Sequence, residues 1–129
     1  MKPIPRLQRI EPTLLTRLRA TYPDIAFSTM RSQSQPPNVE CVLVAEPGQM
    51  ATSVSQYVRL RVSVYAIRED GTGDWQQAQR LAASIEQSIL ELSTTDPLIS
   101  GEHESGPIRI SDDNLIFAYS IILLTVATT

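Results

Sequence analysis

The spacing of apolar side chains predicts two amphipathic helices. Over residues 4–18, apolar side chains recur with a period near 3.6. Proline is tolerated in the first turn of a helix but disrupts a helix interior. Pro12 therefore places the secure start of this helix at about Glu11, and a Tyr-Pro pair ends it. The second helix covers residues 75–92, and Asp74 is its expected N-cap. The apolar faces of both helices need a partner within the fold, an apolar surface against which they can pack.

Alternating apolar and polar positions predict strands that could supply that partner. The strictest alternation is at residues 57–67, where the period of two is typical of a half-buried strand. The second half of the last run is apolar on both sides, which indicates a central, doubly covered strand. A Gly-Pro pair separates two short extended pieces before it. The predicted strands are residues 25–29, 39–45, 57–67 and 115–127, and the two short extended pieces, 98–104 and 108–110, together count as one more.

Residues 46–56 form the longest predicted loop. They contain Pro47, Gly48 and small hydroxylic residues without a convincing period. The loop is longer than a hairpin connection requires, so we expect a flexible segment that either binds something or is disordered. Residues 31–37 and 111–114 are predicted as a second loop and a turn.

The element order is helix, three strands, helix, two strands. Long hairpins favour a mainly antiparallel sheet of four or five strands, with both helices packed on one face. The fold class predicted is therefore α+β. At 129 residues, the chain is expected to form a single domain, residues 1–129.

Composition excludes several broad classes. Hydrophobic residues make up 42% and charged residues 19%, values close to those of globular domains and unlike disordered or coiled-coil chains. No apolar run approaches the ~20 residues of a membrane span, so no membrane partner is expected. The first residues lack a signal-peptide core, so secretion is not expected.

Charge is distributed unevenly along the chain. The net charge is −3, which does not indicate general attraction to nucleic acid. Residues 1–70 carry nine basic and six acidic groups, whereas residues 71–129 carry two basic and eight acidic groups. Ten of the eleven basic residues are arginines, which are enriched at interfaces. This pattern fits either a solvated surface or a head-to-tail interface that closes into a ring.

Few residues could support catalysis or metal binding. Cys41 lies within a predicted strand, where a cysteine is usually a buried hydrophobe. His103 lies in an acidic stretch without a partner motif, and Asp112 and Asp113 are typical of a turn. We therefore predict no enzyme activity, no metal and no cofactor.

Arg59 and Arg61 share one face of the strictly alternating strand. Their face is either an exposed surface of the sheet or an assembly surface, which would lie between subunits or line a lumen.

The order of these patterns resembles the tail terminator (tail completion) proteins of long-tailed bacteriophages. The most specific segment is residues 104–113, in which Ser-Gly-Pro is followed after four residues by Asp and leads into a tyrosine-containing C-terminal strand. This arrangement is similar to terminators from phages of actinobacteria. The resemblance covers nearly the whole chain.

The resemblance implies a virion structural protein that forms a homohexameric ring on the tail tube in the neck region. Such a ring stops tube polymerisation and presents a surface to the head-side connector, and DNA passes through it without sequence-specific contacts. Assembly would take place in the host cytoplasm. The residues expected at ring and tube contacts are Arg59, Arg61, Gln49, Met50, Ala51, Thr52, Ser53, Val54 and Ser55.

Three alternatives stay open from sequence. A head-side neck or head closure protein shares the same general features. A cellular small-molecule-binding regulatory domain would need a pocket with converging polar groups, and the sequence indicates none. An enzyme would need a carboxylate pair, either Glu102 with Glu104 or Asp112 with Asp113.

Overall fold

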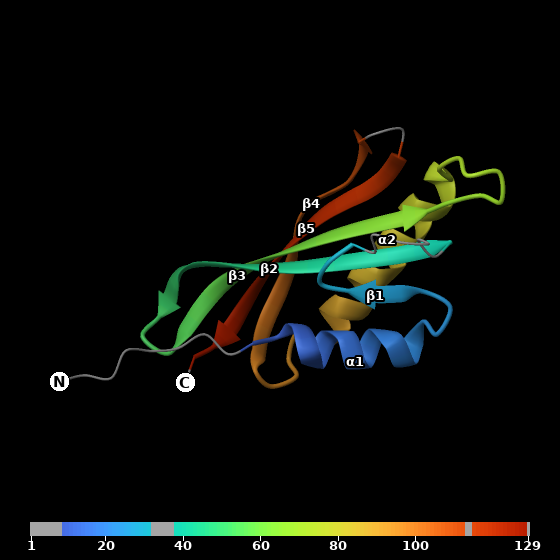
Figure 1. Cartoon of the computed structure of the whole chain (residues 1–129). Coiled ribbons are helices and arrows are strands. Elements are labelled where there is room, and N and C mark those ends of the chain that lie inside the picture. The colour runs from blue at the N-terminus through green and yellow to red at the C-terminus, as the bar shows by residue number, and fades with distance from the viewer. Residues whose placement is uncertain (1–8, 32–37, 113–114, 129) are drawn as a thin grey trace.

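Two helices and five strands form the computed structural model of the chain (Figure 1). The structure describes residues 9–31, 38–112 and 115–128. Most of the predicted early turn before Glu11, most of the 31–37 loop, and Asp113 lie outside these residues. The elements are α1 (Glu11–Thr21), β1 (Ala26–Ser28), β2 (Val39–Thr52), β3 (Ser55–Ala66), α2 (Trp75–Glu91), β4 (Leu98–Asp112) and β5 (Leu115–Ala127).

The five strands form one mixed sheet in the order β1-β2-β3-β5-β4. The short strand β1 pairs with β2 in parallel, and every other neighbouring pair is antiparallel. The predicted α+β class is therefore confirmed, and the sheet, predicted as mainly antiparallel with four or five strands, has five. The strand order also places β1, β2 and β3 on one side of the sheet and β5 and β4 on the other.

The core forms along the alternating side chains of the central strands. Every second residue of β3 from Val58 to Ala66 is fully buried, while the residues between them are half-buried or exposed. Both helices contribute to the same buried cluster. Its helical members are Leu14, Leu18, Ala78, Ala82, Ile85 and Ile89.

Both helices begin where the sequence predicts. Pro12 lies in the first turn of α1, and the Asp74 side chain caps α2 by accepting a hydrogen bond from the backbone N–H of Gln77 at 3.2 Å. The Tyr22 hydroxyl, just after α1, lies 2.6 and 2.8 Å from the hydroxyls of Ser84 and Ser88 on α2. Neither described helix has the length and apolar character that a bilayer-spanning helix needs.

The predicted loop at residues 46–56 is wrong. β2 continues to Thr52 and β3 begins at Ser55, so the segment is the end of a β-hairpin with a two-residue turn. The Thr52 hydroxyl lies 2.6 Å from the Ser55 hydroxyl and accepts a hydrogen bond from the backbone N–H of Val54. Residues 46–50 are all exposed, so neither face is buried and the alternation that identifies a strand is missing.

The predicted break at Gly106 is also wrong, because β4 runs continuously from Leu98 to Asp112. Its pairing with β5 shifts register at three places, including the Gly-Pro pair, and therefore it lacks a steady alternation. Gly106 adopts φ +94°, a conformation that favours glycine. The turn predicted at residues 111–114 begins later than predicted, because Ser111 and Asp112 still belong to β4.

Candidate functional site: the arginine face and the hairpin arm

Arg59 and Arg61 lie on the sheet face opposite the fully buried side chains of β3, as the alternation predicts. Cross-strand pairing places Glu46 of β2 opposite Arg59, and Leu123 and Ile121 of β5 opposite the two arginines. We call this surface of β2, β3, β5 and β4 the arginine face. It consists of Glu46, Tyr57, Arg59, Arg61, Glu104, Tyr119, Ile121 and Leu123.

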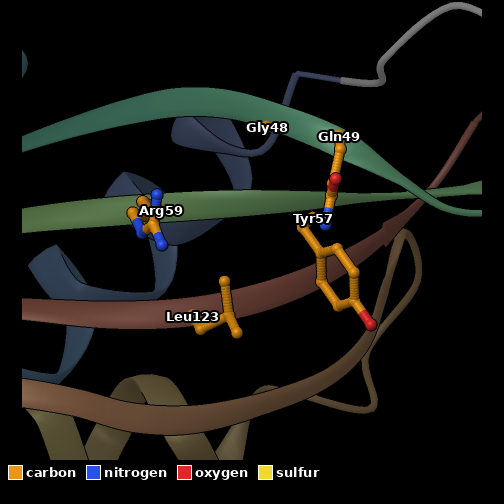
Figure 2. Close-up of a pocket in the computed structure, with 5 residues that line it drawn as sticks. All are labelled: Gly48, Gln49, Tyr57, Arg59 and Leu123. Atoms are coloured by element: carbon orange, nitrogen blue, oxygen red, sulfur yellow. The ribbon is translucent and has the colours of Figure 1, made fainter.

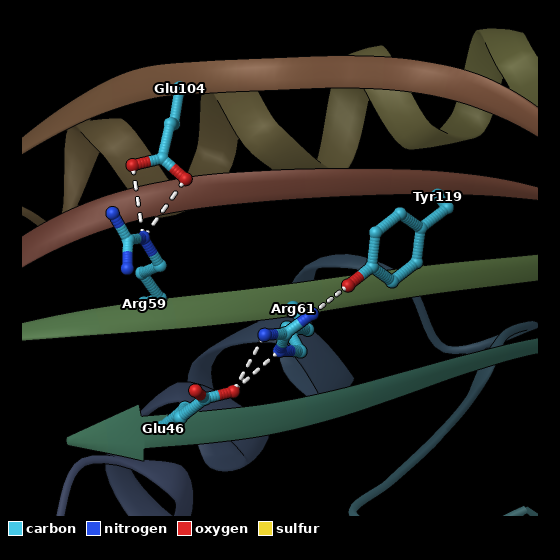
Figure 3. A network of polar contacts seen from close by, with 5 residues as sticks. All are labelled: Glu46, Arg59, Arg61, Glu104 and Tyr119. Carbon is cyan, nitrogen blue, oxygen red and sulfur yellow. Dashed lines mark hydrogen bonds and ion pairs between the residues drawn. The ribbon is translucent and has the colours of Figure 1, made fainter. Parts of the chain in front are cut away.

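Arg59 is paired with a carboxylate across the sheet. Its Nε donates to both carboxylate oxygens of Glu104 on β4, at 3.1 Å each (Figure 3). The Arg59 side chain is about half exposed, so this pair contributes at most about 1 kcal/mol to folding. The pair instead fixes the direction of the guanidinium on the surface.

Arg61 joins three strands. Its guanidinium donates to the hydroxyl of Tyr119 on β5, and its Nε and Nη2 lie 2.8 and 2.7 Å from a carboxylate oxygen of Glu46 on β2 (Figure 3). The hydrogen bonds to Tyr119 and then to Glu46 raise the pKa of Arg61 above its ordinary value. Arg61 is therefore held as a fixed cation over the centre of the sheet.

A hollow of about 380 Å³ lies beside Arg59 on this face (Figure 2). Gly48 and Gln49 of β2, Tyr57 and Arg59 of β3, and Leu123 of β5 line it. The sequence indicates no converging set of polar groups, yet the structure brings an amide, a phenol and a guanidinium around one apolar side chain. Such a combination can receive a polar group of a ligand or of a neighbouring protein.

The hairpin arm, residues 46–56, contains the other predicted contact residues. In Figure 1 the arm extends past both helices at one end of the sheet. Val54 at its turn is 66% exposed, whereas Ser55 is buried. The backbone N–H of Thr128 donates to the carbonyl of Val54, which fastens the turn to the chain after β5.

The predicted contact residues thus fall into four groups. Gln49 and Arg59 meet at the hollow, while Arg61 belongs to the network with Tyr119 and Glu46. Met50 and Val54 are exposed apolar residues on the arm. The remaining arm residues are Ala51, which is half-buried, the exposed Ser53, and Thr52 and Ser55, which bond each other.

Sequence reasoning missed Tyr57, Tyr119, Glu46 and Leu123 on this face. Tyr57 precedes Arg59 by two positions, so alternation alone would have placed it on the arginine face. Glu46 was missed because it was assigned to a loop. The two β5 residues could be found only from the register between β3 and β5, which the sequence does not encode locally.

The residues considered for chemistry take other roles. Cys41 is completely buried, and burial, followed by the nearby Glu40 charge, raises the pKa of its thiol above its ordinary value of 9.0. His103 Nδ1 lies 2.5 Å from a carboxylate oxygen of Glu86 on α2. Glu104 is paired with Arg59 rather than with a second carboxylate. In the described ranges no three His, Cys, Asp or Glu side chains are grouped to hold a metal ion.

The comparisons with known proteins give no family: no protein-family model matches the sequence, and no curated protein matches it.

Proposed function

We propose that this chain is a structural virion protein, a tail terminator that caps the phage tail tube as a ring. The ring stops addition of further tube subunits and offers its other side to the head-side connector. The partners are further copies of the chain, the tail tube protein and a head-side neck protein. Binding and assembly, not catalysis, are the proposed activity, and the site of action is the neck of the virion.

The observation that carries this proposal is the hairpin arm. The β3 half of the arm pairs with β5, but residues 46–50 of β2 are all exposed and bury little that would stabilise their own domain. The arm also presents Met50 and, at its turn, Val54 to solvent. Exposed apolar groups beside a fixed cation are typical of a surface that docks on another protein.

We also infer that both helices pack on one face of the sheet and leave the arginine face for assembly contacts. This is supported by the single buried cluster that both helices share with the inward side chains of β3. Arg59 and Arg61 alternate with those side chains and therefore point away from the cluster.

Negative-stain electron microscopy of the protein mixed with matching tail tubes tests the function. We expect rings on one end of each tube. Val54→Asp places a charge at the tip of the arm and is expected to abolish this density, while Met30→Asp, at a 71% exposed position outside the arm, should retain it. Density on the portal of filled heads but not on tube ends would favour the head-side neck protein instead.

The hollow favours a second candidate, a small-molecule-binding domain. Gln49, Tyr57 and Arg59 line it, and because Arg59 is already paired with Glu104, the hollow favours a polar rather than an anionic ligand. Native mass spectrometry of freshly purified protein tests this: a bound metabolite that is lost in Arg59→Gln would support it, and its absence would leave the assembly role alone.

A further inference from the structure

The two outer edges of the sheet are open in the described part of the chain. β1 pairs only with Glu40, Cys41 and Val42 of β2, so no described strand pairs with the outer edge of β2 from Leu43 to Thr52. β4 forms the opposite edge over its full length. An open edge presents unpaired backbone N–H and C=O groups and readily accepts another strand.

Exposed apolar side chains gather on these same edges. Six large hydrophobic residues are exposed among the described residues, and four of them belong to β2 and β4. Val44 and Met50 lie on β2, Ile99 and Ile108 on β4, and each is 43–50% exposed. Each open edge therefore carries two apolar side chains in addition to its backbone groups.

Because of the strand order, the two sides of the sheet differ in net charge, as the two halves of the sequence do. Described residues up to 70, which form α1, β1, β2 and β3, carry seven basic and six acidic groups. Described residues from 71 onward, which form α2, β4 and β5, carry two basic and seven acidic groups. β2 itself carries two acidic residues and no basic one, but Glu40 and Glu46 form ion pairs with Arg31 and Arg61. Contact between two β4 edges would therefore bring two strongly acidic sides together, whereas contact between a β4 edge and a β2 edge would bring only one.

We propose that copies of this chain associate head to tail by pairing the outer edge of β2 in one copy with the outer edge of β4 in the next. The pairing extends the sheet from copy to copy and covers the four exposed apolar residues. Such a heterologous contact closes into a ring when the rotation per copy allows it. This inference rests on the proposed ring and specifies which surfaces form it.

Two edge variants test the pairing by native mass spectrometry. Val44→Lys with Met50→Lys blocks the β2 edge, and Ile99→Lys with Ile108→Lys blocks the β4 edge. We expect the wild type to form closed oligomers and each variant alone to be monomeric. An equimolar mixture of the variants should form a dimer that contains one copy of each, because each variant keeps the edge that the other has lost.

Met30→Lys with Gln79→Lys is the matched control. It adds the same two charges at exposed positions outside both edge strands and should form oligomers like the wild type. Homodimers of either edge variant would overturn the head-to-tail arrangement, since they require contact between like edges. Edge variants that assemble like the wild type, or a wild type that stays monomeric, would also overturn the inference.

Disulfide trapping provides an independent measurement. Four double variants, each with one cysteine at Val44 or Met50 and one at Ile99 or Ile108, sample different registers. At least one of them should give a ladder of cross-linked oligomers after oxidation, while each single variant should stay uncross-linked. The native Cys41 is fully buried and does not interfere. Absence of a ladder in all four overturns the edge pairing. The proposed capping role fails only if the wild type is also missing from tube ends in the microscope.

Discussion

At the scale of single residues, Gly106 shows how closely β4 approaches β5. A Cβ added at this glycine would lie 2.4 Å from the carbonyl oxygen of Tyr119, and its φ of +94° is itself unfavourable for other residues. We therefore predict that Gly106→Ala lowers the free energy of unfolding by more than about 2 kcal/mol, because strain and overpacking act together. Urea denaturation followed by circular dichroism measures this loss.

Gly71 provides the matched control. Its φ is +85°, but a Cβ there would meet nothing within 4 Å. Gly71→Ala should therefore cost only the backbone strain, about 1 kcal/mol. Equal losses for the two substitutions would contradict the assigned contact between Gly106 and β5.

Cys41 should make folding sensitive to alkaline pH. Burial raises the pKa of the folded thiol above 9.0, so the unfolded chain loses the proton first as pH rises. The stability contributed by the neutral thiol is complete below pH about 9 and is lost above it, by at most about 1.4 kcal/mol per pH unit. Denaturation curves of wild type and Cys41→Ala between pH 7 and 10.5 should converge above pH 9. Curves that stay parallel would mean that the thiol titrates normally.

At the scale of elements, the sequence predicts those that are buried on one face. β3 and α2 have a regular apolar period because one side of each contacts the core, whereas β5 was predicted from an apolar run and is fully buried on one face only, not on both as expected. The bounds of all three agree closely with prediction. The hairpin arm and β4 were missed or divided because exposure of both faces and register shifts remove that period. The same reasoning explains the site: Arg59 and Arg61 were found by alternation, whereas their partners depend on strand pairing.

The start of α2 is a local feature that can be tested by itself. Asp74 caps the helix and also lies 3.7 Å from Arg68. We predict that Asp74→Ala lowers the free energy of unfolding by about 1 kcal/mol, because the backbone N–H of Gln77 loses its acceptor. Asp74→Asn keeps an acceptor but not the charge and should retain most of the stability in the same urea titration. A loss of equal size in both variants would assign the effect to the ion pair instead.

At the scale of the whole molecule, stability is unevenly distributed in a way that suits assembly. The centre of the sheet, where β3 and β5 pair, is covered by the core, whereas the arm and the β4 edge are not. Regions that bind partners are usually among the less stable parts of a structure. The segments proposed for contact are thus those that can adjust without disturbing the core.

Hydrogen exchange measured by mass spectrometry tests this division. In a monomeric edge variant, amides of residues 48–52 should exchange much faster than those of residues 60–66, because the former lie on an exposed open edge and the latter in the buried centre. Compared with that monomer, wild-type rings should exchange more slowly at residues 43–52 and along β4, and binding of tail tubes should further slow exchange at the turn of the arm. The central residues should not change in either step, which makes them the internal control. Protection at the turn without protection of the edges would mean that the arm docks on the tube while the copies associate through another surface.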